Sequence, residues 1–536
     1  MTLPLHFAQG ARPFADEMTA QGLGFLLAVP FVKVWTALFG TSALVLASRL
    51  FYVALASSAG YVIYRALRPT FGSWVTAIAV AVVLLAPPYN VMAVSYNTVA
   101  VLAFAAATAL AWQAVRDGDR RAAAAAGVAA AVGAVSYVSL APVALALVCT
   151  LAVVGWRRRV VPVFLIALVG AGALFGGLLL LLVSPHAITV ALRYSSDVWG
   201  TNRSLTDRAS VLLTHLRVVL TGRWLIPMWI LAVLACVPWF SPRVRAVALA
   251  LLPLAATVLP AWHHRADRIM FFGRFGTACL VTISAGLLVP VVFWAVHGAM
   301  RARRRATTDE AGRDRRPDAL RLLALAAPPA LVGFVIVALS TSSGWYRALA
   351  FVGLAPLTIV LVADWGRTVR RDGGRLIFAP AAGALVVVLL VALFASSFKD
   401  GASWSLTHRI WHGPLAGIAT SDRRAAEIAA VEAQGRRWVR PHDRVLVFNS
   451  PLAYALVGGR MFTNADWLQS GHSDQVTVDY FARQHRAPDV VFLSSGIAAR
   501  SGGSALTDTN DPLVRFLAAH YRVVESGQLL DVLVRR

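Results

Sequence analysis

Residues 161–183 read VPVFLIALVGAGALFGGLLLLLV, a run of apolar side chains that contains no charge. A helix of about 20 such residues is long enough to cross the roughly 30 Å hydrocarbon core of a bilayer. The whole chain shares this character: it has a mean hydropathy of +0.66, 58% hydrophobic residues and only 14% charged residues. Soluble domains have about 25% charged residues. The sequence therefore excludes a soluble globular enzyme and predicts a polytopic membrane protein.

Similar apolar runs recur along the first four hundred residues, separated by short loops that differ in their Arg content. Six of these loops carry 21 Arg, whereas three short loops that alternate with them carry only Arg265 and Arg268. Because loops on the cytoplasmic side are enriched in Lys and Arg, the N-terminus, the long 185–224 loop and the C-terminal part are expected outside. We predict about twelve spanning helices, near 43–64, 73–89, 98–115, 122–138, 139–155, 160–184, 225–241, 246–262, 274–298, 320–340, 347–364 and 377–397.

The composition changes after residue 398. Helical periodicity over 420–437 is followed by the strand-like DRVLVFN (443–449), a turn and short helix in PLAYALVGG (451–459), and a second strand in PDVVFLSS (488–495). Strands that alternate with helices indicate an α/β domain. The predicted fold is thus mainly α: an outer segment at 1–42, a membrane helical domain at 43–397, and a small extracytoplasmic α/β domain at 398–536.

Charge and cysteine content narrow the possible partners. The formal net charge is +24, but the Arg residues occur in bursts between apolar runs, not along one basic face, which argues against nucleic acid. The three cysteines, Cys149, Cys236 and Cys279, all lie in apolar runs, so neither a disulfide framework nor a thiolate metal site is expected. No Gly-rich phosphate loop or nucleotide-binding fingerprint is present.

The first outer segment contains an adjacent acidic pair, Asp16 and Glu17. The apolar stretch that follows, near 23–39, is interrupted by Pro30 and Lys33, which favours a helix along the outer interface over a spanning one. A carboxylate at this boundary suits a general base that takes the proton of an acceptor hydroxyl, or a ligand of a divalent cation. Alternatively, the two acids only cap the following helix. No signal peptide is expected here.

Two further outer loops carry candidate substrate-binding residues. In APPYNVMAVSYN (86–97), Tyr89, Tyr96 and Asn97 combine aromatic faces with neutral hydrogen-bonding groups suited to a sugar, although interfacial Tyr residues also serve as membrane anchors. The loop AWHHRADRIMFFGRFG (261–276) gathers cations where the charge rule expects few. Cationic side chains of this kind can bind either the phosphate of a lipid-linked substrate or ordinary phospholipid head groups. The residues concerned are His263, His264, Arg265, Arg268 and Arg274.

Three stretches resemble the GT-C superfamily of integral membrane glycosyltransferases, of the bacterial type that uses polyprenyl-phosphate sugars. GARPFADEMTAQGLGFLLAVPFVKVW (10–35) resembles the family's first outer loop, and PPYNVMAVSYNTVAVLAFAAAT (87–108) resembles its second. PHDRVLVFNSPLAYALVGGRM (441–461) resembles the strand and turn of C-terminal extracytoplasmic domains. The family has a helix before its first outer loop. This sequence shows no such helix, and we therefore expect that its start codon is placed too far downstream.

The resemblance implies an inverting transfer of a sugar from a polyprenyl-phosphate donor to a glycan, lipid or protein acceptor outside the cell membrane. It implies Asp16 as the base, with Glu17 as the less favoured choice. A divalent cation bound by these carboxylates stays open as a cofactor. Membrane lipids would be further partners of this cell-envelope enzyme. The main alternative is a transporter or flippase for a lipid-linked or small-molecule substrate. The other two alternatives are an O-antigen-ligase-like or polymerase enzyme and a non-catalytic membrane scaffold.

Overall fold

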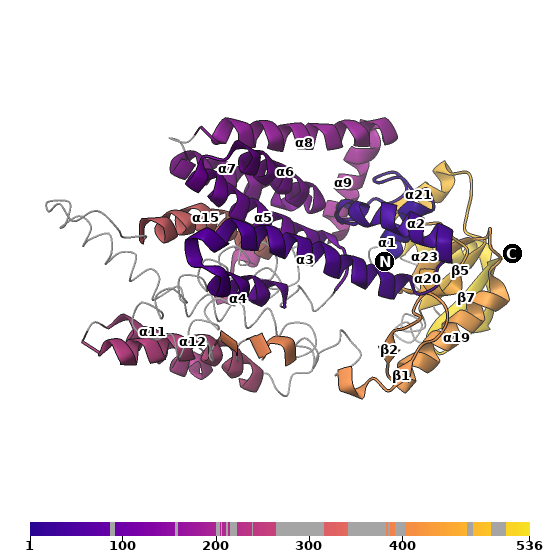
Figure 1. Cartoon of the computed structure of the whole chain (residues 1–536). Helices are drawn as coiled ribbons and strands as arrows, with labels where there is room; N and C mark the ends of the chain where they lie inside the picture. The colour runs from indigo at the N-terminus through magenta and orange to yellow at the C-terminus, as the bar shows by residue number, and fades with distance from the viewer. Residues whose placement is uncertain are drawn as a thin grey trace. The chain divides into compact units, whose positions relative to one another are not determined.

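The structure is a computed structural model of the whole chain, and it falls into two compact units. One unit comprises Met1–Phe51, Gly176–Gly200 and Ser405–Arg536, and the other comprises Tyr52–Phe175 and Thr201–Trp404. We call these the sheet unit and the helical unit and describe each by itself (Figure 1). The structure describes residues 1–85, 92–155, 159–199, most of 204–263, 316–340, a few positions in 382–391, 403–468, 475–494 and 511–536.

Within these residues, five helical segments are long and apolar enough to cross a membrane: Gly22–Phe39, Leu44–Phe71, Tyr96–Asp117, Val138–Gly155 and Val161–Leu182. Four of them coincide with predicted spans, which confirms a polytopic helical bundle. The predicted spans at 274–298 and 347–364, and most of 377–397, lie outside the described residues. The remaining helices of the helical unit are α4 (Ser73–Leu84), α6 (Arg120–Ser136), α11 (Ile226–Cys236), α12 (Pro242–His263) and α15 (Arg316–Ser340).

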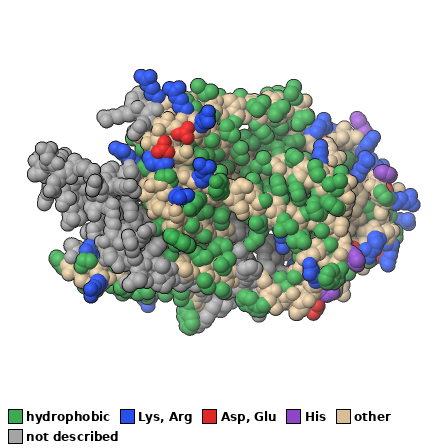
Figure 2. Space-filling view, in the orientation of Figure 1, with side chains coloured by type: hydrophobic (Ala, Val, Ile, Leu, Met, Phe, Trp, Pro, Cys, Tyr) green, Lys and Arg blue, Asp and Glu red, His purple; other side chains and the backbone are tan. Residues whose placement is uncertain are grey.

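The spanning helices divide into buried and surface helices. In α5 (Tyr96–Asp117), 83% of the most apolar window is buried, whereas in α8 (Val161–Leu182) none of it is. The exposed side chains of α8 include Ile166, Val169 and Leu174, which are 63–73% exposed. Figure 2 shows apolar side chains over much of the visible face. A surface of this kind is expected where a helix faces lipid, so α8 is a peripheral helix of the bundle and α5 a central one.

Small residues allow α6 to pack closely against its neighbours. A Cβ at Gly133 would lie 2.7 Å from the ring of Phe104 in α5, and a Cβ at Gly127 would lie 2.4 Å from the backbone oxygen of Phe164 in α8. Glycine and alanine are used in this way where membrane helices approach one another. The Ala-rich stretch near 122–138 is only mildly apolar, yet it forms the predicted helix because its small residues fit between α5 and α8.

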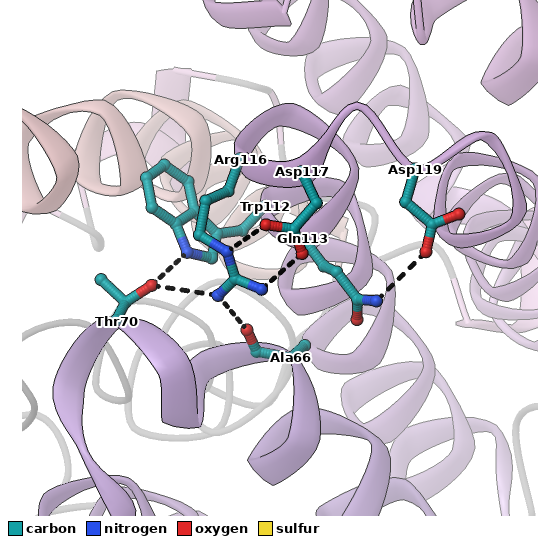
Figure 3. A network of polar contacts seen from close by, with 7 residues as sticks. All are labelled: Ala66, Thr70, Trp112, Gln113, Arg116, Asp117 and Asp119. Carbon is teal, nitrogen blue, oxygen red and sulfur yellow. Dashed lines mark hydrogen bonds and ion pairs between the residues drawn. The ribbon is translucent and has the colours of Figure 1, made fainter.

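A polar network joins the end of α3 (Leu44–Phe71) to the end of α5 (Figure 3). The indole N–H of Trp112 donates to Thr70 Oγ1 over 3.0 Å, and the Arg116 guanidinium donates to the Ala66 carbonyl over 3.1 Å. Arg116 also pairs with Asp117 at 2.6 Å. A cation at the carboxyl end of a helix satisfies carbonyl groups that have no partner within the helix.

The C-terminal part of the sheet unit is an α/β domain, as predicted. Its five-stranded sheet has the order β4-β3-β5-β7-β6, in which β4 (Arg460–Met461), β3 (Arg444–Phe448) and β5 (Val490–Ser494) are parallel. Strand β7 (Leu530–Arg535) runs antiparallel to β5, and β6 (Tyr521–Ser526) runs antiparallel to β7. The helices are α19 (Asp422–Trp438), α20 (Ala453–Val457), α21 (Gln475–Arg483) and α23 (Pro512–His520), and a small pair β1 (His408–Arg409) and β2 (Ala419–Thr420) precedes them.

The N-terminal residues pack against this α/β domain. Helix α1 (Thr2–Ala8) buries Leu5 in a cluster with Val32, Leu44 and Ala455. The sequence of residues 1–22 did not predict this buried helix, because the segment is polar as a whole. The predicted segments 1–42 and 398–536 therefore belong to the same compact unit.

The apolar stretch near 23–39 forms the 3-10 helix η1 (Ala20–Ala28) followed by α2 (Val29–Phe39). In α2 only Val32 is buried, while Val34, Leu38 and Phe39 are exposed. Its placement along the interface stays a prediction, because the same stretch also has the length and hydropathy of a span. The 185–224 region, expected to be a loop, begins with the amphipathic helix α9 (Pro185–Trp199).

Candidate active site

The acidic pair lies on a tight turn between α1 and η1. The backbone N–H of Phe14 donates to the carbonyl of Glu17 over 2.7 Å, and Phe14 has a φ of +63°. Positive φ is uncommon for a residue with a side chain and often occurs where the chain is held in a special geometry. The turn gives the two neighbouring acids different surroundings.

Asp16 is the accessible member of the pair, with a side chain that is 16% exposed. Its Oδ2 accepts hydrogen bonds from the backbone N–H of Arg12 at 2.9 Å and from Arg12 Nε at 3.1 Å. Its Oδ1 lies 3.4 Å from Gln484 Nε2, and Tyr480 lies close enough that burial together with the Asp16 charge raises the pKa of the Tyr480 hydroxyl. A fixed, partly exposed carboxylate of this kind is suited to accept a proton from a bound hydroxyl group.

Glu17 is fully buried. Its Oε1 accepts hydrogen bonds from the Thr19 hydroxyl at 2.5 Å and the Thr19 N–H at 3.2 Å, and its Oε2 accepts one from the Asp466 N–H at 2.9 Å. Burial raises the pKa of Glu17 well above its usual range, and the nearby Asp466 raises it further. Glu17 thus favours the neutral form and ties the turn to the α/β domain.

Two more ionisable side chains surround the pair. Burial raises the pKa of Asp466 as well. His6, on α1, is 4% exposed, and burial lowers its pKa to about 4 although Asp16 partly opposes this shift. Its Nδ1 has no hydrogen-bond partner among the described residues. His6 is therefore neutral near pH 7, and the fixed cation beside Asp16 is Arg12.

The turn lies at the carboxyl end of the parallel strands. The Met18 N–H donates to the carbonyl of Asn464, three residues after β4 ends, over 2.7 Å. The sequence does not predict that Tyr480, Gln484 and Asp466 are neighbours of the pair. No local pattern marks them, since they are 449–468 residues away from it along the chain.

The other predicted site residues are only partly described. Tyr96 and Asn97 form the first turn of α5, behind the N-cap residue Ser95, and Asn97 is buried. The Tyr96 ring meets that of Tyr137 edge-on, with centroids 5.1 Å apart. His263 ends α12, but its side chain is not described. The predicted residues outside the described part are Tyr89, His264, Arg265, Arg268 and Arg274.

The described residues contain no group of three or more His, Cys, Asp or Glu side chains placed to hold a metal ion. Asp16 Oδ2 is already paired with a guanidinium, and the Glu17 carboxylate is bound to Thr19 and Asp466. A divalent cation here would have to replace these partners.

Apolar spanning helices together with an α/β unit define a multi-spanning membrane protein. No protein-family model and no curated protein matches the chain. Among solved structures the chain is similar to ArnT from Cupriavidus metallidurans bound to undecaprenyl phosphate, with 15% identity, a TM-score of 0.40, and coverage of 99% of this chain and 91% of that one. No residue of the site is assigned from this similarity.

Proposed function

We propose that the chain is a membrane glycosyltransferase that moves a sugar from a polyprenyl-phosphate donor to an acceptor hydroxyl on the outer side of the membrane. Asp16 is the general base and Glu17 the residue that positions it. The observation that carries this assignment is the contrast between the two neighbouring acids. Asp16 is partly exposed and held by side chains on both oxygens, whereas Glu17 is buried and tied to Thr19 and Asp466.

In the proposed reaction, the acceptor oxygen attacks the anomeric carbon while the bond from that carbon to the phosphate oxygen breaks. Asp16 takes the proton of the acceptor hydroxyl, and the polyprenyl phosphate leaves with the bonding electrons. Attack opposite the leaving group inverts the anomeric centre. The donor already carries an activated glycosyl–phosphate bond, so no nucleotide is required on the outer side.

The remaining predicted residues receive supporting roles from their chemistry alone. We assign the cations of the 261–276 loop, Arg265, Arg268 and Arg274 with His263 and His264, to the donor phosphate, where charge develops as the bond breaks. Tyr89, Tyr96 and Asn97 are assigned to the sugar. Both assignments rest on sequence.

The first test compares Asp16→Asn and Glu17→Gln in membranes supplied with radiolabelled polyprenyl-phosphate sugars. Loss of transfer in Asp16→Asn, with transfer retained in Glu17→Gln, is the expected result. Asp422→Asn, an exposed carboxylate in the same unit, is the matched control. Full activity of a folded Asp16→Asn protein contradicts the assignment of the base, and loss of transfer on chelation would identify a required divalent cation.

A second test addresses orientation. Since the charge pattern puts the α/β domain outside, a reporter enzyme that is active only outside the cytoplasm should be active when fused after Arg536. An inactive reporter, together with transport of a lipid-linked substrate but no transfer, would favour the transporter or flippase.

A further inference from the structure

The α/β domain has a topological switch point at the end of β3. Strand β3 pairs with β4 on one side and with β5 on the other, and all three are parallel. The chain therefore leaves β3 toward one edge of the sheet and returns to the opposite side for β5. Open α/β sheets bind ligands in the crevice outside the carboxyl ends of their strands at such a point.

Asn449 borders this switch point, and Trp467 lies beside it on the β4 side of β3, where Leu468 bridges to Phe448; the two have the chemistry of a sugar-binding subsite. Asn449 directly follows β3, is exposed, and has a φ of +57°. Its backbone N–H donates to the carbonyl of Leu468 over 2.8 Å, which places 467–468 beside the end of β3. There the indole N–H of Trp467 points to Asn449 Oδ1 at 3.5 Å, and the Trp467 side chain is 43% exposed.

An exposed indole beside an amide matches the two kinds of surface on a sugar. The C–H groups of a pyranose ring pack on an aromatic face, and its hydroxyl groups exchange hydrogen bonds with an amide, which both donates and accepts.

The position relative to Asp16 connects this pair to the chemistry. Trp467 directly follows Asp466, whose backbone N–H is bonded to Glu17, and Glu17 is the neighbour of Asp16. The same loop, through Asn464, accepts a hydrogen bond from Met18. Buried hydrogen bonds thus join the turn that carries the base to the loop that carries Trp467.

We infer that Trp467 and Asn449 form a subsite for a neutral sugar residue of the acceptor, next to Asp16. That the bound sugar belongs to the acceptor rests on the proposed function. The sugar-binding site itself does not depend on transfer activity. It narrows the acceptor to a molecule that carries at least one uncharged sugar ring.

The direct test measures binding of methyl glycosides and short neutral oligosaccharides to the purified full chain by saturation-transfer NMR. We expect saturation of sugar ring protons by the wild type and a decrease of about tenfold in affinity for Trp467→Ala. Asn449→Gly removes the amide but keeps the positive φ, so it should weaken binding without loss of fold. Trp411→Ala is the matched control, since Trp411 is 67% exposed in the same unit.

The outcomes separate this subsite from the proposed function. Binding that depends on Trp467 in a protein without transferase activity supports the subsite and contradicts the enzyme assignment. Transfer with an acceptor KM that does not change in Trp467→Ala supports the enzyme and overturns the subsite. Absence of binding to the wild type, or equal loss in Trp411→Ala, also overturns it.

Discussion

The backbone N–H of Asp466 donates a 2.9 Å hydrogen bond to the buried carboxyl group of Glu17, although the two residues are 449 positions apart. Together with the Met18–Asn464 bond, this contact fixes the turn that carries Asp16 to the end of the sheet. The site therefore depends on the α/β domain as much as on the N-terminal segment.

Replacement of Glu17 should show this dependence. Glu17→Ala leaves the Asp466 N–H and the Thr19 hydroxyl without their acceptor, so we expect a loss of about 1–3 kcal/mol in the free energy of unfolding. Glu17→Gln keeps a carbonyl acceptor and should lose less. Thermal unfolding of the detergent-purified chain measures the effect. Asp479→Ala, an exposed carboxylate on α21, is the control and should change stability by less than about 0.5 kcal/mol.

The pH dependence of this contact follows from the neutral state of Glu17. Because burial and Asp466 raise the pKa of Glu17, its contribution is fully present below the ordinary pKa of 4.5 and is lost as pH rises through the raised value. Hydrogen–deuterium exchange in residues 12–19, corrected for intrinsic rates, should accelerate as pH increases. Glu17→Gln cannot ionise and should show a weaker dependence, with Asp466 as the remaining group. An unchanged dependence would contradict the role of Glu17.

Much of the architecture could be predicted because it is local. The apolar runs of α5 and α8, and the buried strands VLVF and VVFL, can each be recognised from the pattern of a few neighbouring residues. The position of Asp16 could not be derived in this way. Its neighbour Tyr480 lies on α21, a short helix with no motif, its partner Gln484 directly follows that helix, and β4 has only two residues. Such contacts arise from tertiary packing, about which neither periodicity nor charge pattern carries information.

Helix α1 shows the same limit. Its stretch LPLHF, residues 3–7, is too short to indicate a helix by periodicity, yet Leu3, Leu5 and Phe7 are all buried. The acidic pair itself was predictable as a candidate, but not the difference between its members. That difference depends on which acid the turn directs inward.

Tyr480 gives a test of how the base is held. Tyr480→Phe removes a hydroxyl that lies near the Asp16 carboxylate and keeps the buried ring, whose centroid is 5.6 Å from that of Phe462. We expect kcat to fall by about three- to tenfold with little change in the KM of the donor. Phe462→Leu, which alters the packing of the Tyr480 ring but keeps its hydroxyl, should leave kcat in place. An equal fall of kcat in both variants would indicate a merely structural role.

The helical unit allows a last test, at the junction of α3 and α5. Trp112 is 1% exposed, and its N–H has Thr70 Oγ1 as acceptor at 3.0 Å. Trp112→Phe keeps an aromatic side chain but removes this donor and part of the packed volume, so we expect a loss of about 1–2 kcal/mol. Trp74→Phe is the control, because Trp74 on α4 is 79% exposed and faces away from the core. Unfolding of both variants in mixed detergent compares them directly. Equal stability of the two variants would mean that the network of Figure 3 contributes nothing measurable to the packing of α3 against α5.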